Sequence, residues 1–255
     1  MPHLDRILIY PIKSLDPVSV KQSRVLRNGA LEFDRQWAIV DASGKFLNGK
    51  RTPLVHLLHA TFDDQFEHVT FAFENRSARF HLSNDLDALE AWLGDVFQQP
   101  VRLLENAFGG YPDDNEAPGP TVISTATLST VASWFPPMTL DECRLRFRAN
   151  LEIADAEPFW EDQLYGRMGS QIDFQVGSIA FAGTNPCQRC VVPTRNSQTG
   201  EVWPKFAVEF GKHRQASLPA WTERSRFDHF YRLAVNTHLT GKGGMIRTAD
   251  PIGVE

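Results

Sequence analysis

The sequence contains little cysteine and no long apolar run. Of its 255 residues only three are cysteines: Cys143, Cys187 and Cys190. Three thiols are too few for a disulfide-framed secreted scaffold, or for a cluster that needs four cysteine ligands from one chain. No stretch approaches the ~20 apolar residues of a membrane-spanning helix, and the first residues lack the pattern of a signal peptide. We therefore expect a soluble, cytoplasmic protein with free thiols and no membrane partner.

The chain also lacks an excess of basic residues. It has 26 Lys and Arg against 31 Asp and Glu, a net charge of −5, whereas nucleic-acid binders usually show a basic balance. We therefore expect no nucleic-acid partner. Hydrophobic residues make up 42% and charged residues 22%, a globular composition. The length is that of one large domain or two small ones.

Patterns of period two dominate the chain and predict mostly strands. The expected strands lie at residues 6–10, 36–47, 69–82, 144–148, 172–181, 231–235 and 245–247, several of them paired as hairpins. Apolar stripes of helical spacing occur only at residues 85–97, 124–135 and, more weakly, 205–213.

Residues 108–120 are rich in Gly, Pro and acids, and they have no periodicity. This segment is typical of a linker, or of a long surface loop within one domain. We take it as a boundary and expect two domains, residues 1–112 and 113–255. The predicted fold class is mainly β (α+β), with two β-barrel-like domains and a few peripheral helices.

The pair Cys187-Gln188-Arg189-Cys190 is the first candidate for chemistry. Structural zinc would need two more ligands at suitable spacing, and the sequence has no second C-x-x-C pair to supply them. A thioredoxin-type motif requires a helix after the pair, and Val191-Val192-Pro193 does not begin one. Inert thiols and a single reactive thiolate remain. A neighbouring cation lowers the pKa of a thiol, so Arg189 beside Cys190 favours the thiolate. A lone thiolate without a base suits a soft metal better than acyl transfer.

Basic and hydroxyl residues stand at several strand ends. Lys13 and Ser14 follow the first strand, Arg35 precedes the next, and Arg148 and Asn150 follow the arginine-rich run. Lys, Ser and Arg at such places can hold a phosphate, or they can form a solvated face with salt bridges. The acids of residues 157–162, beside Pro and aromatic residues, fit a loop that packs a pocket wall better than an acid–base pair.

Six short motifs in order resemble the MOSC family, in its two-part form with an N-terminal MOSC β-barrel domain, a form that includes amidoxime reducing components. They are YPIKS at 10–14, DRQW at 34–37, RFRAN at 146–150, PFWED at 158–162, CQRC at 187–190 and TG at 199–200. The resemblance covers nearly the whole chain. Two departures stand out: Ala149 where the family usually has Pro, and no acid in residues 195–198, a loop that shapes the substrate entrance.

The resemblance implies a pterin-bound molybdenum cofactor (Mo-molybdopterin) between the two domains. It makes Cys190 the metal ligand and the catalytic centre. The implied cofactor-binding residues are Lys13, Ser14, Arg35, Arg148 and Asn150. Ser124, at an expected helix N-cap, could present backbone N–H groups to an anion.

The function implied is a molybdenum-dependent oxidoreductase that reduces N-hydroxylated or otherwise N-oxygenated small molecules by oxygen-atom transfer. Electrons would come from a separate protein of the ferredoxin, flavodoxin or cytochrome b5 type. The alternative is a cofactor-binding or sulfur-carrier module with a persulfide on Cys190 and no small-substrate turnover. Pyridoxal phosphate, sometimes attributed to the family, is not expected because no Lys lies in a recognisable pyridoxal site.

Overall fold

The computed structural model describes residues 1–254, which contain fifteen strands and four α-helices. The strands are β1 (His3–Ile9), β2 (Val18–Val20), β3 (Gln22–Val25), β4 (Trp37–Asp41), β5 (Leu58–Phe62), β6 (His68–Phe73), β7 (Arg76–His81), β8 (Val101–Glu105), β9 (Val122–Ser124), β10 (Leu151–Ala154), β11 (Ile172–Val176), β12 (Ile179–Gln188), β13 (Arg232–Leu239), β14 (Gly244–Arg247) and β15 (Ile252–Val254). The helices are α1 (Leu86–Phe97), α2 (Thr125–Ser133), α3 (Leu140–Phe147) and α4 (Phe206–Ala216), with short 3₁₀ turns η1 (Pro53–His56), η2 (Trp160–Leu164), η3 (Val192–Thr194) and η4 (Arg224–Arg226).

The mainly β fold class predicted from the sequence is confirmed. The strand pairings found among residues 1–254 give open sheets and close no complete barrel. None of the helices in that range is long and apolar enough to cross a membrane.

The largest sheet has eight strands in the order β15-β11-β12-β13-β9-β10-β1-β2. All neighbours are antiparallel except β9 and β10. β1 from the start of the chain lies inside this sheet, because it pairs with β10 through Ile7 opposite Leu151. The two residues belong to one buried core with Phe174, Phe181 and Val235. The sheet therefore extends across the boundary predicted at residue 112, and a division into two folding units there stays a prediction.

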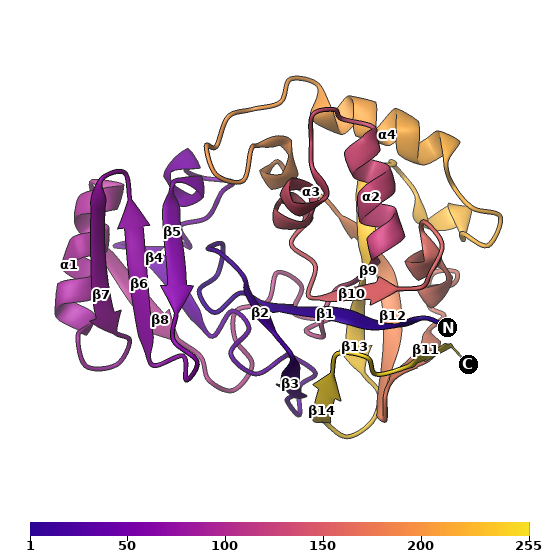
Figure 1. Ribbon diagram of the computed structural model, residues 1–255, viewed down its shortest axis with the longest axis horizontal. Helices are drawn as coiled ribbons and strands as arrows, with labels where there is room; N and C mark the ends of the chain where they lie inside the picture. The colour runs from indigo at the N-terminus through magenta and orange to yellow at the C-terminus, as the bar shows by residue number, and fades with distance from the viewer. Residues whose placement is uncertain (255) are drawn as a thin grey trace.

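A smaller region lies beside the large sheet and contains β4 to β8 and α1 (Figure 1). β5, β6 and β7 form a meander, and β4 pairs with β8. The apolar stripe of α1 buries Leu89 and Leu93 in a second core. Trp92 of the same helix stacks on Phe71 of β6, with ring centroids 5.7 Å apart. Both the hairpin and the helix were predicted from period alone.

Helices α2, α3 and α4 gather on one side of the large sheet (Figure 1). They enclose a third core with a dense aromatic centre, in which Phe135 stacks on Phe206 at 4.3 Å and Phe147 packs on Phe210 at 5.6 Å. The predicted helices at 124–135 and 205–213 are confirmed as α2 and α4.

The prediction of a strand at 144–148 is wrong, because these residues end α3. Thr139 caps the helix by accepting a hydrogen bond from the backbone N–H of Glu142 at 3.1 Å. Arg144 and Arg146 do not share a solvated strand face, because both are buried in ion pairs with Glu152 and Glu142, at 2.6 Å each. Five residues of alternation are too few to separate period two from the spacing of a short helix.

Candidate functional site

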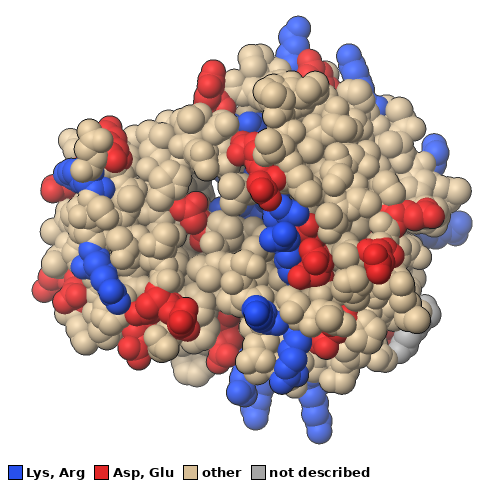
Figure 2. Space-filling model, in the orientation of Figure 1, with Lys and Arg blue, Asp and Glu red and all other residues tan. Residues whose placement is uncertain are grey.

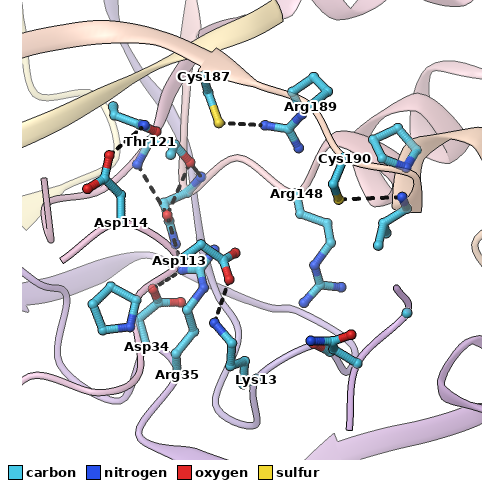
Figure 3. A pocket seen from close by; sticks show the side chains of 18 of the residues that line it. Lys13, Asp34, Arg35, Asp113, Asp114, Thr121, Arg148, Cys187, Arg189 and Cys190 are labelled. Carbon is cyan, nitrogen blue, oxygen red and sulfur yellow. Dashed lines mark hydrogen bonds and ion pairs between the residues drawn. The ribbon is translucent and has the colours of Figure 1, made fainter. Parts of the chain in front are cut away.

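One cavity of about 680 Å³ collects most of the residues selected from the sequence. Lys13, Ser14, Arg35, Arg148, Asn150 and Cys190 all line it. On the face drawn in Figure 2 the surface is hollowed between the smaller region and the large sheet, with charged side chains beside the hollow. Figure 3 shows the cavity from close by: the side chain of Arg148 extends between Cys190 and Lys13.

Lys13 is a buried cation of the cavity wall. It follows β1, and its ammonium donates hydrogen bonds to the carbonyl of Tyr111 at 2.9 Å and to the Asp113 carboxylate at 2.5 Å. Burial lowers the pKa of Lys13, and the nearby Asp113 carboxylate partly offsets this by raising it. Asp113 belongs to the Gly- and Pro-rich segment expected as a linker, of which residues 112–119 line the cavity. That segment is therefore a cavity wall as well as a connection.

Tyr10, just before Lys13, provides a flat surface under two guanidinium groups. Arg148 lies over its ring at 4.1 Å and Arg35 at 5.3 Å. Such cation–π stacking orients a guanidinium while leaving its N–H groups free. Burial raises the pKa of Tyr10 to about 12 despite both arginines. Arg35 is also paired with Asp34, whereas Arg148 gives only one hydrogen bond, to the Leu15 carbonyl at 2.7 Å.

Asn150 lines the cavity, but its amide is used inside the protein. Its NH₂ group donates to the Leu8 carbonyl of β1 at 3.0 Å. Its oxygen accepts hydrogen bonds from the N–H and hydroxyl of Thr121, both at 3.2 Å, and a longer one from Arg35. Asn150 thus fixes β1, the segment before β9 and Arg35 relative to one another, which is a positioning role.

The two thiols of the C-x-x-C pair differ in their surroundings. Cys187 ends β12 and accepts a hydrogen bond from Arg189 at 3.1 Å. The same guanidinium donates to the Phe147 carbonyl at the end of α3 at 2.5 Å. The cation expected beside Cys190 therefore bonds to Cys187 instead. The Cys190 thiol is half-buried and contacts the Val192 N–H at 3.5 Å. Cys143 is buried in the third core, and burial raises the pKa of its thiol to about 12.

The cavity wall carries positive charge that the protein does not neutralise. Arg148, Arg189 and Arg195 line it, and none of the ion pairs among residues 1–254 includes any of them. The Nε atoms of Arg189 and Arg195 are buried without a hydrogen-bond partner. Buried polar atoms are normally satisfied, so the wall suits a ligand with anionic or acceptor groups.

Ser124 differs from its expected role. Its side chain does cap α2, accepting a hydrogen bond from Thr127 N–H at 3.1 Å. However, Ser124 is fully buried away from the cavity, and its own N–H donates to the Glu161 carboxylate at 3.2 Å. Glu161 and Asp162 likewise lie in the protein interior and not in the cavity wall, contrary to the expectation for residues 157–162.

Sequence reasoning missed several residues of the cavity wall. They are His56 of η1, Asn236 of β13 and residues 112–119. Also missed was Tyr10, which is fully buried beneath the arginines. Tyr10 stood inside a motif already selected, so its stacking role could have been proposed. The others come from separate segments, and nothing in their spacing indicates that they meet. Among residues 1–254 no group of three or more His, Cys, Asp and Glu is placed to hold a metal ion.

Two family models match this chain. The model of the MOSC N-terminal beta barrel domain matches residues 1–94, and that of the MOSC domain matches residues 121–252. The chain belongs to the MOSC family.

The curated relatives carry a more particular name. The chain is 28% identical over 248 residues to "Molybdenum cofactor sulfurase" of Drosophila mojavensis, covering 85% of this chain and 31% of that protein. It is 29% identical to the protein of that name in Drosophila melanogaster, covering 85% and 31%, and 22% identical to the human one, covering 78% and 27%. The chain thus spans less than a third of these relatives. The solved YUAD protein from Bacillus subtilis is 13% identical, with a TM-score of 0.43 over 100% of this chain and 96% of that one.

Proposed function

We propose that this protein binds a pterin-type molybdenum cofactor in the cavity and uses it to reduce N-oxygenated small molecules. The convergence of six predicted residues from four separate motifs, Cys190 among them, on that one cavity carries the proposal. The relatives named molybdenum cofactor sulfurase support the cofactor. The reaction itself rests on the family resemblance.

The residues of the cavity fit such a group. A pterin cofactor has a phosphate, and three cations line the cavity: Arg35 and Arg148 over the Tyr10 ring, and Lys13 over the Phe46 ring. A thiolate is a soft ligand, suited to a metal already held by sulfur, and Cys190 has a single long N–H contact. The cavity volume of about 680 Å³ lies within the range of small-molecule and cofactor sites, roughly 300–1,000 Å³.

In this proposal the protein holds and orients the cofactor. The chemistry that the cofactor supplies when bound is two-electron oxygen-atom transfer, in which R–NHOH, two protons and two electrons give R–NH₂ and water. Cys190 would ligate the metal, and Lys13, Ser14 and Arg35 would hold the phosphate end. Asn150 would keep Arg35 in place through its bonds to β1 and Thr121. A separate ferredoxin-, flavodoxin- or cytochrome b5-type protein would deliver the electrons.

The test compares Cys190→Ala with Cys187→Ala, a matched variant in the same cavity wall. Both are purified from a host that makes the cofactor, and molybdenum is measured by elemental analysis. We expect Cys190→Ala to lose at least about tenfold in bound metal and Cys187→Ala to retain it. Stoichiometric molybdenum in Cys190→Ala would overturn the ligand assignment. Reduction of benzamidoxime by the wild-type protein with an artificial electron donor tests the reaction.

A sulfur-carrier role is the second candidate, favoured by the name of the curated relatives. There Cys190 would carry a persulfide, and the protein would not turn over small substrates. Mass spectrometry of the Cys190 peptide, after alkylation without a reductant, distinguishes the two roles, because a persulfide adds one sulfur atom to that peptide. A protein with that extra sulfur and no reduction of benzamidoxime would favour the carrier.

A further inference from the structure

The segment that follows Cys190 brings a second cationic group, Arg195, to one corner of the cavity wall. Arg195 follows η3 directly, and its guanidinium donates one hydrogen bond, to the Gly200 carbonyl at 3.1 Å. Its Nε atom is buried without a partner, and no ion pair among the described residues includes it. Arg195 therefore keeps most of its donors and its full charge at the cavity wall.

A carboxylate near this corner, Glu142, already has partners inside the protein. Glu142 accepts hydrogen bonds from Arg146 at 2.6 Å, from the Ser197 N–H at 3.0 Å and from the Ser197 hydroxyl at 2.5 Å. Arg146 is thereby neutralised and also donates to the Pro193 carbonyl at 3.2 Å. The charge of Glu142 is balanced by Arg146, and no ion pair among the described residues includes Arg195, so the corner keeps a net positive charge.

His56 completes the corner from the other side. It is buried, with 9% of its surface exposed, and its Nε2 atom has no hydrogen-bond partner. A Cβ atom at Gly49 would lie 2.9 Å from that nitrogen, and one at Gly200 would lie 3.5 Å from the His56 Cβ, so the ring is packed between two glycine turns. Burial, then Arg148, Arg195 and Arg146, lowers the pKa of His56 against the opposing effect of Glu142. The ring is therefore neutral at pH 7 and has one N–H to donate.

We propose that Arg195 and His56 form an anion subsite that binds a carboxylate of the substrate, so that the preferred substrates are N-oxygenated compounds bearing a carboxylate. This inference rests on the proposed reductase function. A guanidinium and a neutral imidazole can give a carboxylate charge-assisted hydrogen bonds from two directions. The subsite is built on the segment that follows Cys190, since Pro193 and Arg195 both line the cavity beside that thiol.

The phosphate of the cofactor is the other anion that could occupy this corner, and the experiment separates the two. Arg195→Gln is compared with Lys212→Gln, which removes the same charge from an exposed position on α4. For each protein, molybdenum content is measured, and KM and kcat are determined for 4-carboxybenzamidoxime and for neutral benzamidoxime. Binding of 4-carboxybenzamidoxime to the cofactor-free protein, followed by calorimetry, gives a readout that does not depend on turnover.

If the subsite binds the substrate, Arg195→Gln raises KM for the carboxylated substrate by about tenfold or more. It leaves KM for benzamidoxime, kcat and molybdenum content unchanged, and it weakens calorimetric binding. Lys212→Gln changes none of these. Loss of molybdenum in Arg195→Gln would assign the corner to the cofactor phosphate and overturn the proposal, as would equal KM changes for both substrates. A wild-type protein that holds molybdenum but reduces neither compound would refute the reductase function instead.

Discussion

Glu161 allows a sharp test of the electrostatics of the interior, away from the cavity. It lies beneath the start of α2, with 1% of its surface exposed. One carboxylate oxygen accepts hydrogen bonds from Ser124 N–H at 3.2 Å and from the Thr127 hydroxyl at 3.0 Å. The other has no partner among the described residues. Burial, then the neighbouring Asp162, raises the pKa of Glu161 from 4.5 to about 7.

This pKa determines how stability depends on pH. Between the unfolded pKa and the folded pKa the native state binds more protons than the unfolded state, so the free energy of unfolding falls as pH rises. The stabilisation is fully present below pH 4.5 and is lost as the pH passes through about 7. Between pH 5 and pH 8 the loss amounts to about 2–3 kcal/mol.

Glu161→Gln removes the titration and keeps the shape. Its amide oxygen can accept from Ser124 and Thr127, and its NH₂ group takes the place of the unpartnered oxygen, as the protonated acid would. Urea unfolding of both proteins at pH 5, 6, 7 and 8 is followed by circular dichroism. From pH 5 to pH 8 the free energy of unfolding of the variant should rise relative to that of the wild type by about 2–3 kcal/mol. A stability difference independent of pH would refute the raised pKa.

Two further predictions concern backbone packing and the fixing of β1. Gly183→Ala on β12 places a Cβ 1.8 Å from the Leu164 carbonyl oxygen, so thermal unfolding should show a destabilisation of about 2 kcal/mol or more. Gly253→Ala is the control: its Cβ meets nothing within 4 Å, and the midpoint of unfolding should stay unchanged. Asn150→Ala leaves the Leu8 carbonyl and the Thr121 donors without partners and should lower stability by about 1–3 kcal/mol in urea; an unaltered urea midpoint would show that these bonds do not hold β1.

From the sequence, individual helices and strands could be predicted better than the contacts between residues that are distant in the chain. The stripe of Leu89, Trp92 and Leu93 identified α1, because one buried face repeated over three turns is hard to produce by chance. The prediction of a strand at residues 144–148 was wrong because five residues of alternation fit both a strand and the end of a short helix. The cavity residues near Lys13 and Cys190 carried a motif signal. His56 and Arg195 did not, because they come near one another only through the packing of two turns that are distant in the sequence.

The place of β1 inside the large sheet has a consequence for synthesis on the ribosome. Its partner β10 begins at Leu151. The apolar strand of residues 3–9 therefore leaves the ribosome long before the strand with which it pairs. At about 5–20 residues per second that interval lasts roughly 7–30 s. During this time Leu4, Ile7 and Ile9, all buried in the final structure, have no native partner from β10. The nascent chain should therefore depend on chaperone protection of its first residues more than the finished protein does.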